Sequence, residues 1–412
     1  MSRSERTWFG QPPGLTILFL TETWERFSFY GMSTLLVYYM TKQLHFTQAD
    51  ASLVYGLYAG GVYLTPIAGG FVADRWLGKR RAILIGGTLM ALGHFALAWE
   101  AQFYTGLLLI CVGNGLFLPN LPSQIGDLYA EDDPRRAGAY NVYYVGVNLG
   151  GLLAPLVCGT LGEVHGWHWG FGMAGVGMCL GLAIYMAGQR HLPASDRPPV
   201  RQAGRAPPGD GQPLNAAALM LLLGIWLAVV LFRSAYAQSG NTVALWVDQA
   251  VDLELLGFQV PATWVQCLNP LFVFLFTPLL VAGWRRQARQ GREPAPLRKM
   301  ALGAAAVGGA FLLLAFAAGP GGGRLVPAAW VFVFFLLYTV GELFILPTGL
   351  ALFARQAPRG MAATMIAAWF LAAFAGNFAS GWLGHWWAPL GPAGFFGLLG
   401  GVAGVSALCL WG

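Results

Sequence analysis

Long apolar runs dominate the chain and recur along its whole length, separated by short polar segments. Most runs hold about 20 residues with almost no charge, which is the length that an α-helix needs to cross a hydrocarbon core of about 30 Å. Because lipid offers the backbone no hydrogen-bond partners, such runs must fold as helices. We predict twelve membrane-spanning helices, at residues 14–41, 50–74, 81–99, 103–129, 137–160, 168–188, 215–246, 258–284, 299–318, 327–354, 361–387 and 392–412.

One longer polar stretch, rich in Pro, Gly and Arg, interrupts this pattern between the sixth and the seventh run. Its composition is typical of a linker. We therefore predict an N-terminal six-helix bundle at residues 1–188, a cytoplasmic linker at 189–214 and a C-terminal six-helix bundle at 215–412. An all-α membrane protein of six plus six helices has the layout of the major facilitator fold, in which two bundles face each other across a cavity.

Composition supports a membrane protein and excludes several other classes. Of the 412 residues, 56% are hydrophobic and only 10% are charged, against roughly 25% charged in ordinary soluble domains. The chain holds neither an HExxH nor a GxSxG motif, and its histidines show no metal-ligand spacing. We therefore expect no enzyme activity, no metal and no cofactor.

Basic residues predict how the chain is oriented, because cytoplasmic loops of membrane proteins are enriched in Lys and Arg. With the N-terminus inside, 20 of the 24 basic residues fall in cytoplasmic segments, whereas only Lys42 and Arg324 fall in the opposite loops. We predict a multi-pass protein of the cell inner membrane with both termini cytoplasmic. The net charge of +6 then reflects topology and contact with anionic membrane lipids, and no nucleic-acid partner is expected. The 20 cytoplasmic residues are Arg3, Arg6, Arg75, Lys79, Arg80, Arg81, Arg135, Arg136, Arg190, Arg197, Arg201, Arg205, Arg285, Arg286, Arg289, Arg292, Arg298, Lys299, Arg355 and Arg359.

Five charged residues lie near the middle of the predicted spans, where charge is costly and usually functional. They are Glu22, Glu25, Arg26, Arg233 and Glu342. Three acids against two arginines leave one net negative charge, so binding one proton makes the set neutral. A proton-coupled carrier needs such a site, although a static ion network that braces helices would have the same balance.

Two faces of the predicted helices carry polar side chains. Glu22, Glu25, Arg26 and Tyr30 fall on one face of the first span, which must face protein or water rather than lipid. In the fifth span, Asn148 belongs to a second polar stripe. We interpret Asn148 as a cavity residue because the glycines around it, at 146, 150 and 151, leave space.

The segment from Glu22 to Tyr30 resembles the ExxER signature of the proton-coupled oligopeptide transporter family, a branch of the major facilitator superfamily. Six further blocks resemble this family in the same order along the chain. They are Gly70–Arg81, Gly113–Asn120, Tyr143–Gly150, Leu268–Pro270, Gly341–Pro347, and Trp369–Leu371 together with Gly376–Phe378. One block would be weak evidence, but seven in register indicate a specific relationship.

The resemblance implies roles for individual residues. Glu22, Glu25 and Arg26 match the family's proton-linked triad, and Glu342 matches the acid that meets the amino terminus of a bound peptide. Asp74 and Arg75 match the loop between the second and third spans, where an acid and several bases connect the ends of helices. Pro347 is the last residue of the block in the tenth span. For all three residues the resemblance implies a gating or structural role. Residues that match the lining of the peptide pocket are Tyr30, Tyr63, Asn148, Asn269, Trp369 and Phe370.

Three positions depart from the family pattern. Leu118 replaces the usual lysine of the fourth span, whereas Ser33 and Ala237 replace a basic residue and an acid that usually pair in a gate. Arg233 stands where the family usually has an aromatic residue. We expect Arg233 to replace the missing lysine, either by binding the peptide carboxylate or by pairing with Glu342. The alternative is an arginine that extends to the interface or pairs locally.

The resemblance therefore implies proton-coupled symport of di- and tripeptides by alternating access, with protons as the coupling ion and the chain acting as a monomer. The alternative is a proton-coupled carrier of another small zwitterion or anion, such as an amino acid or nitrate.

Overall fold

The structure is a computed structural model that describes residues 10–130, 133–193, 216–255, 257–319, 325–355 and 362–411. The chain forms two compact units. Unit 1 comprises Met1–Tyr39 and Gly61–Arg201, and unit 2 comprises Met40–Gly60 and Gln202–Gly412. The segment Met40–Gly60 groups with unit 2, although the segments on both sides of it in the sequence belong to unit 1.

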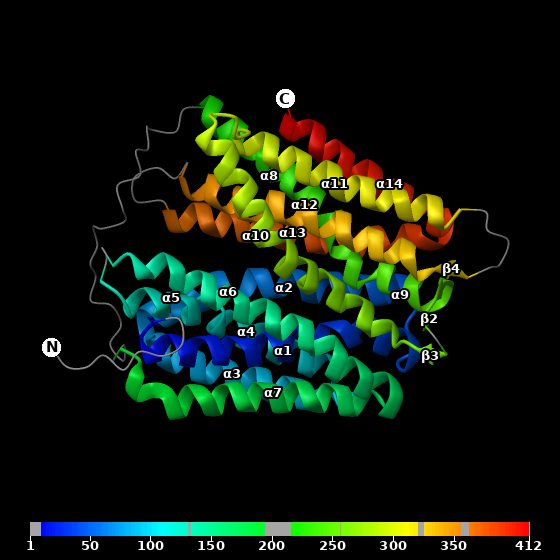
Figure 1. The fold of residues 1–412 in the computed structure, drawn as a ribbon. Helices are drawn as coiled ribbons and strands as arrows, with labels where there is room; N and C mark the ends of the chain where they lie inside the picture. Colours follow the sequence, from blue (N-terminus) through cyan, green and yellow to red (C-terminus); the bar gives the residue numbers. More distant parts are fainter. Residues whose placement is uncertain are drawn as a thin grey trace. The chain divides into compact units, whose positions relative to one another are not determined.

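Helices account for most of the described residues (Figure 1). Within the described part of the chain, four two-residue strands form two small pairs: β1 (Val251–Asp252) with β4 (Val326–Pro327) in parallel, and β2 (Glu254–Leu255) with β3 (Phe258–Gln259) in antiparallel orientation. The helices are α1 (Pro13–Lys42), α2 (Gln48–Val72), α3 (Lys79–Ala96), α4 (Phe103–Phe117), α5 (Asn120–Asp127), α6 (Arg135–Ala154), α7 (Trp167–Gly188), α8 (Ala216–Tyr236), α9 (Thr242–Ala250), α10 (Leu268–Arg289), α11 (Pro296–Ala317), α12 (Ala328–Arg355), α13 (Ala362–Leu383) and α14 (Trp387–Trp411).

Among the described residues, nine helical stretches are long and apolar enough to cross a membrane. Helix α1 is not one of them because it carries Glu22, Glu25 and Arg26, and α3 begins with three consecutive basic residues. Helices α13 and α14 count together, as the single stretch Thr364–Trp411. The chain is therefore a helical, multi-pass membrane protein, as predicted.

Part of the sequence prediction lies outside the described residues. The predicted linker lies outside the described residues from residue 194 onward. The same holds for several basic residues on which the predicted orientation rests, namely Arg3, Arg6, Arg197, Arg201, Arg205, Arg324 and Arg359.

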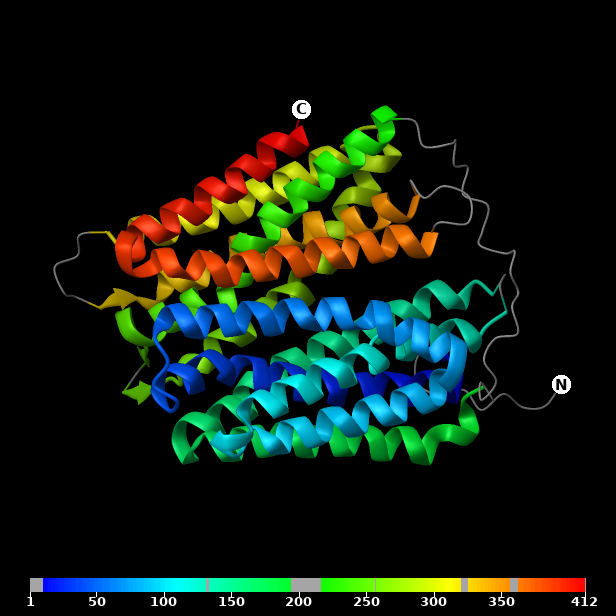
Figure 2. The ribbon, with the colours of Figure 1, turned by 180° about the vertical axis from the view of Figure 1, so that it is seen from behind.

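Unit 1 is organised around α3, which packs along both α4 and α7 (Figures 1 and 2). Buried apolar side chains from several helices form its core, including Leu18 of α1, Met90 of α3, Phe117 of α4 and Tyr185 of α7. Tyr185 also donates a hydrogen bond of 3.0 Å to Gln124 of α5. The core thus joins helices that are far apart in sequence and fixes α1 within the unit.

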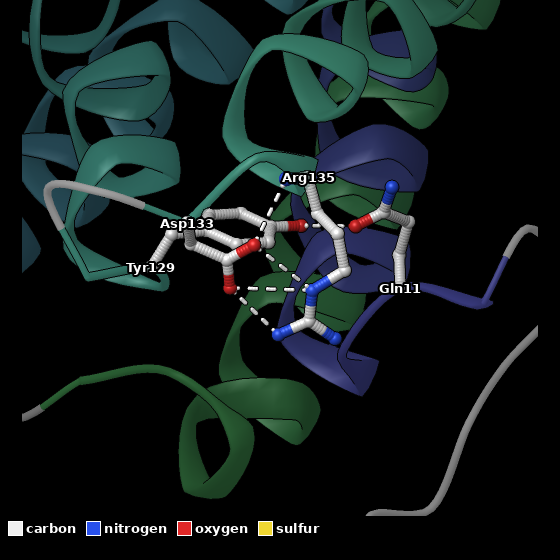
Figure 3. A network of polar contacts seen from close by, with 4 residues as sticks. All are labelled: Gln11, Tyr129, Asp133 and Arg135. Atoms are coloured by element: carbon white, nitrogen blue, oxygen red, sulfur yellow. Dashed lines mark hydrogen bonds and ion pairs between the residues drawn. The ribbon is translucent and has the colours of Figure 1, made fainter.

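A small polar network ties the start of α1 to the connection between α5 and α6 (Figure 3). Tyr129 donates a hydrogen bond of 2.8 Å to Gln11, and the guanidinium of Arg135 pairs with Asp133 at 2.7 Å. The Arg135 guanidinium lies 5.9 Å from the centroid of the Tyr129 ring. Hydrogen bonds from Arg135 lower the pKa of the Asp133 carboxyl, so this contact favours the ionised pair at neutral pH.

Unit 2 is built on α11, which packs along α12 and α14, and on α8, which packs along α13 and α14. Its core is aromatic, with Phe311, Phe334 and Phe396 fully buried. The segment Met40–Gly60 joins this unit through a hydrogen bond of 3.0 Å from Ser52 to Asn241.

Candidate functional site

Glu22, Glu25 and Arg26 form one ion cluster in unit 1, which we name the α1 cluster. The Nε of Arg26 lies 2.9 Å from Oε1 of Glu22 and 2.7 Å from Oε2 of Glu25. All three side chains are buried: Glu25 is 0% exposed and Arg26 9%. One guanidinium therefore faces two carboxylates away from water, which leaves an excess of one negative charge when both acids are ionised.

Other groups complete the surroundings of the α1 cluster. The hydroxyl of Tyr143 on α6 hydrogen-bonds to Glu22, and Tyr30 lies one turn beyond Arg26 on the same face of α1. The guanidinium of Arg26 also lies 5.4 Å from the centroid of the Phe29 ring. Among the described residues, Oε1 of Glu25 and Nη2 of Arg26 have no hydrogen-bond partner. The cluster thus has capacity to bind a proton or a further polar group.

Two glycines of α6 bring this helix against the α1 cluster. A Cβ at Gly146 would lie 2.9 Å from Oγ1 of Thr23, and one at Gly150 would lie 2.4 Å from the Thr23 carbonyl oxygen. Small residues of this kind let membrane helices approach closely. Our interpretation of Gly146 and Gly150 as open space was wrong, because α1 fills the space beside them. Asn148 itself is buried and donates a hydrogen bond of 2.9 Å to the Tyr144 carbonyl one turn earlier.

Replacing Gly150 by alanine is expected to lower the melting temperature of the protein. Alanine normally favours a helix over glycine by about 1 kcal/mol, but here its Cβ would overlap the α1 backbone, and overpacking costs about 1–3 kcal/mol. The matched control is Gly172→Ala on α7, where a Cβ would meet nothing within 4 Å. Thermal unfolding in detergent should show a decrease for Gly150→Ala and none for Gly172→Ala. Equal melting temperatures would contradict the close contact.

Glu342 of α12 is the centre of a second polar group, in unit 2, which we name the α12 cluster. Its Oε2 accepts a hydrogen bond of 2.6 Å from Nδ2 of Asn269, which also lies 3.1 Å from Oγ1 of Thr339. The carboxylate further hydrogen-bonds with Tyr236, and the charge of Arg233 acts on it. Arg233 is 7% exposed. The predicted residues Arg233, Asn269 and Glu342 are thus brought together within unit 2.

A glycine crossing places Glu342 at the contact of α12 with α11. A Cβ at Gly341 would lie 2.5 Å from the carbonyl oxygen of Gly303, and a Cβ at Gly303 would lie 2.6 Å from that of Gly341. The two backbones therefore touch directly beside the acid. This close contact places Glu342 next to the crossing of α11 and α12.

The remaining predicted pocket residues are distributed over both units. In unit 1, Tyr30 is 38% exposed and Tyr63 is partly buried. In unit 2, Phe370 is partly buried, whereas Trp369 is only 4% exposed. Trp369 packs edge-on against Phe353 of α12, with ring centroids 5.6 Å apart. In this structure, Trp369 therefore contributes to the core of unit 2.

The predicted structural residues lie outside both clusters. Asp74 and Arg75 are exposed at the end of α2, where the Arg75 guanidinium lies 5.8 Å from the centroid of the Phe71 ring. At the start of α3, Lys79 pairs with Asp127 of α5 at 2.7 Å. Pro347 lies inside α12, one turn and a half after Glu342, where its missing N–H weakens the helix.

Sequence reasoning missed three tyrosines. Tyr143 contacts the α1 cluster, Tyr236 contacts the α12 cluster, and Tyr338 stacks on Tyr236. A signal existed for the first, because Tyr143, Gly146 and Gly150 recur at i, i+3 and i+7 and so share the face that meets α1. Tyr236 and Tyr338 lie on helices that are separated by about one hundred residues, so no local pattern reveals their pairing. Within the described part of the chain, no group of three or more His, Cys, Asp or Glu residues could hold a metal ion.

Comparisons with known proteins agree with these features. The chain is 32% identical to the peptide transporter YePEPT of Yersinia enterocolitica, with 92% of this chain and 88% of that protein covered. It is also 32% identical to a di-/tripeptide transporter of Lactococcus lactis, with 90% and 89% covered. A crystal structure of a variant of the peptide transporter POT, in complex with alafosfalin, matches with a TM-score of 0.91 and 30% identity over 99% of this chain and 95% of that one.

The sequence model of the POT family matches residues 80–199 and 214–386. These two segments cover most of both units and include Glu342, Asn269 and Arg233. The ExxER segment lies before the matched part of the family model, although the two transporters named above align with about nine-tenths of the chain. The resemblance seen in the sequence is therefore confirmed, and the chain belongs to the POT family.

Proposed function

We propose that the chain is a proton-coupled symporter that carries di- and tripeptides across the cytoplasmic membrane by alternating access. The observation that carries this proposal is the presence of two separate buried charged groups with different chemistry. The α1 cluster has one carboxylate more than its arginine can neutralise. The α12 cluster presents a single carboxylate that accepts a hydrogen bond from a neutral donor and lies near the charge of Arg233. Names of relatives support the substrate class, since they include peptide and di-/tripeptide transporters.

The α1 cluster is suited to bind a proton. Burying two carboxylates beside one guanidinium leaves a net negative charge in a region where unpaired charge is costly. Adding one proton removes that charge and turns one carboxylate oxygen from a hydrogen-bond acceptor into a donor. In our proposal, this difference between the charged and the neutral cluster makes the conformational change depend on protonation, because a ligand shifts an equilibrium only through its different affinity for the two states.

The α12 cluster is suited to bind the amino end of a peptide. An ionised carboxylate only accepts hydrogen bonds, and Glu342 has two oxygens of which Oε2 is already bonded to Asn269. A peptide ammonium would supply further donors and an opposite charge. We propose that Arg233, on the neighbouring helix α8, binds the peptide carboxylate, as the missing lysine at Leu118 suggests.

Twelve membrane-spanning helices, in two bundles at residues 1–188 and 215–412 with a linker at 189–214, are part of the proposal. They follow if α1 and α3 span the membrane despite their charges and if α13 and α14 span it separately. Both termini would then be cytoplasmic, in the inner membrane, and anionic lipids would contact the basic loops. We further propose that one chain transports as a monomer.

Cysteine labelling in intact cells tests this orientation. In a background without the five native cysteines, Glu254→Cys in the strand β2 is expected to react with a membrane-impermeant maleimide. Arg292→Cys, which follows α10, is expected to react only after the membrane is permeabilised. Both positions are exposed, so burial does not determine the result. The opposite accessibility would overturn the proposed orientation.

Uptake into proteoliposomes tests the substrate class. Purified protein should take up labelled dialanine, and unlabelled di- and tripeptides should compete with it. Alanine and nitrate should not compete at equal concentration. Competition by alanine or nitrate, with none by peptides, would instead favour a carrier of another small zwitterion or anion.

A further inference from the structure

Tyr236 contacts both charges of the α12 cluster. It is the last residue of α8, and its hydroxyl forms a hydrogen bond with Glu342. The guanidinium of Arg233, one turn earlier on the same helix, lies 5.7 Å from the centroid of the Tyr236 ring. The tyrosine therefore presents its face to the cation and its polar edge to the carboxylate. An arginine over an aromatic face is held by cation–π attraction, which is stronger away from water.

Tyr338 holds Tyr236 in this position. The two rings stack with centroids 4.7 Å apart and an angle of 9° between their planes, and Tyr338 is 1% exposed. The hydroxyl of Tyr338 donates a hydrogen bond of 2.8 Å to the carbonyl oxygen of Tyr236. This carbonyl lies at the C-terminal end of α8. Since a hydroxyl has one hydrogen, Ser239 must donate the second hydrogen bond, of 2.8 Å, to Tyr338.

Tyr338 also shares a helix face with the acid. Tyr338 and Glu342 are four residues apart on α12, so their side chains lie on the same side. The stack on Tyr236 thus fixes the distance between the end of α8 and the part of α12 that carries Glu342. Phe232 supports the same ring from α8, with centroids 5.5 Å apart. The position of Tyr236 is therefore determined by packing on two sides and by a backbone hydrogen bond.

The carboxylate of Glu342 receives its contacts from three helices. Asn269 comes from α10, Tyr236 and the charge of Arg233 come from α8, and Tyr338 lies near the carboxylate on α12 itself. Of these neighbours, Tyr236 is the one that touches both charged groups. Removing its hydroxyl would leave Glu342 with the Asn269 bond and would free the carboxylate to turn. The aromatic ring of residue 236 would remain in contact with the Arg233 guanidinium.

We propose that Tyr236 is a specificity-determining residue for ligands with a free amino group, and that Tyr338 is the residue that positions it. The Tyr236 hydroxyl orients Glu342 toward an incoming ammonium group, while its ring holds the Arg233 guanidinium at a set place beside the acid. Each of the two charges would then meet the opposite charge at one end of a short peptide zwitterion. The inference rests on the proposed function, because it assigns the amino end of the peptide to Glu342.

Inhibition of dialanine counterflow by two matched ligands tests the inference. The ligands are a free-amine peptide, dialanine, and its N-acetylated form. Tyr236→Phe keeps the ring and removes only the hydroxyl. It should weaken inhibition by dialanine about tenfold, as expected for a hydrogen bond to a charged group, and leave inhibition by the N-acetylated peptide within about twofold. Tyr338→Phe keeps the stack and removes the hydrogen bond to the Tyr236 carbonyl, so it should cause a smaller loss, of about threefold, in the same direction.

Tyr104→Phe is the control, because Tyr104 is exposed on α4 in unit 1. It should leave inhibition by both ligands unchanged. Equal losses for the two ligands in Tyr236→Phe would mean that the tyrosine only supports the fold, and unchanged inhibition would mean that it has no role at the site. Either result would overturn the inference. A wild-type protein that does not transport dialanine at all would instead contradict the proposed function.

Discussion

Arg26→Ala is expected to abolish proton-driven accumulation of peptide. The substitution removes the one cation that faces two buried carboxylates, and breaking a buried ion pair in this way costs about 3–5 kcal/mol. The two acids would then remain protonated through the cycle, so the cluster could no longer bind and release a proton. Glu22→Gln and Glu25→Gln should abolish accumulation as well, because each fixes the cluster in its neutral state. The measurement is uptake of labelled dialanine into proteoliposomes with an inward proton gradient.

Counterflow exchange distinguishes loss of coupling from loss of folding. Counterflow needs peptide binding and the conformational change but no net proton movement, so part of it should remain in the two glutamine variants. Arg285→Gln is the matched control, since Arg285 is exposed at the end of α10 and lies outside both clusters. Full proton-driven uptake in all three variants of the α1 cluster would show that this cluster only stabilises the fold and does not couple transport to protons.

Glu342→Gln is expected to weaken binding of free-amine peptides on the order of 100-fold, because it removes the charge that faces the peptide ammonium, and loss of a buried charge partner costs about 2–5 kcal/mol. Binding of N-acetylated peptides should change much less, since they carry no ammonium group. The glutamine has nearly the same shape and still accepts a hydrogen bond from Asn269, so the packing of α12 is preserved. Competition with labelled dialanine over a range of pH values is the measurement.

The control for this variant is Glu254→Gln, which changes an exposed acid in β2 and should affect neither ligand. The pH dependence of dialanine binding should also become flatter in Glu342→Gln, because an amide does not titrate. Equal loss of affinity for both ligands, together with an unchanged pH profile, would show that Glu342 is not the site of the peptide amino terminus.

Much of the fold could be predicted because lipid imposes simple rules on a chain. Apolar runs of helical length predicted the helices, and the deviations have clear causes. Helix α1 is less apolar than the other long helices because it carries the α1 cluster. The charged residues that make it a weaker candidate for a membrane span are therefore the residues that indicate function. The close approach of Glu22, Glu25 and Arg26 was predictable as well, because residues at i, i+3 and i+4 share a helix face.

Other features depend on contacts that sequence spacing does not reveal. The interpretation of Gly146 and Gly150 as open space failed because a glycine indicates close approach of something, and only the structure identifies it as α1. The grouping of Met40–Gly60 with unit 2 depends on contacts such as Ser52 with Asn241, which are 189 residues apart. Tyr236 and Tyr338 were missed for the same reason, because aromatic residues are common in these helices and their pairing is long-range.

The most direct test of the account is accumulation of dialanine by the wild-type protein in proteoliposomes at zero membrane potential, with and without an inward proton gradient. The internal concentration of dialanine should rise above the external concentration only when the gradient is present, and a proton ionophore should abolish this rise. Uptake that stops at equal concentrations on both sides, regardless of the gradient, would contradict proton-coupled peptide transport.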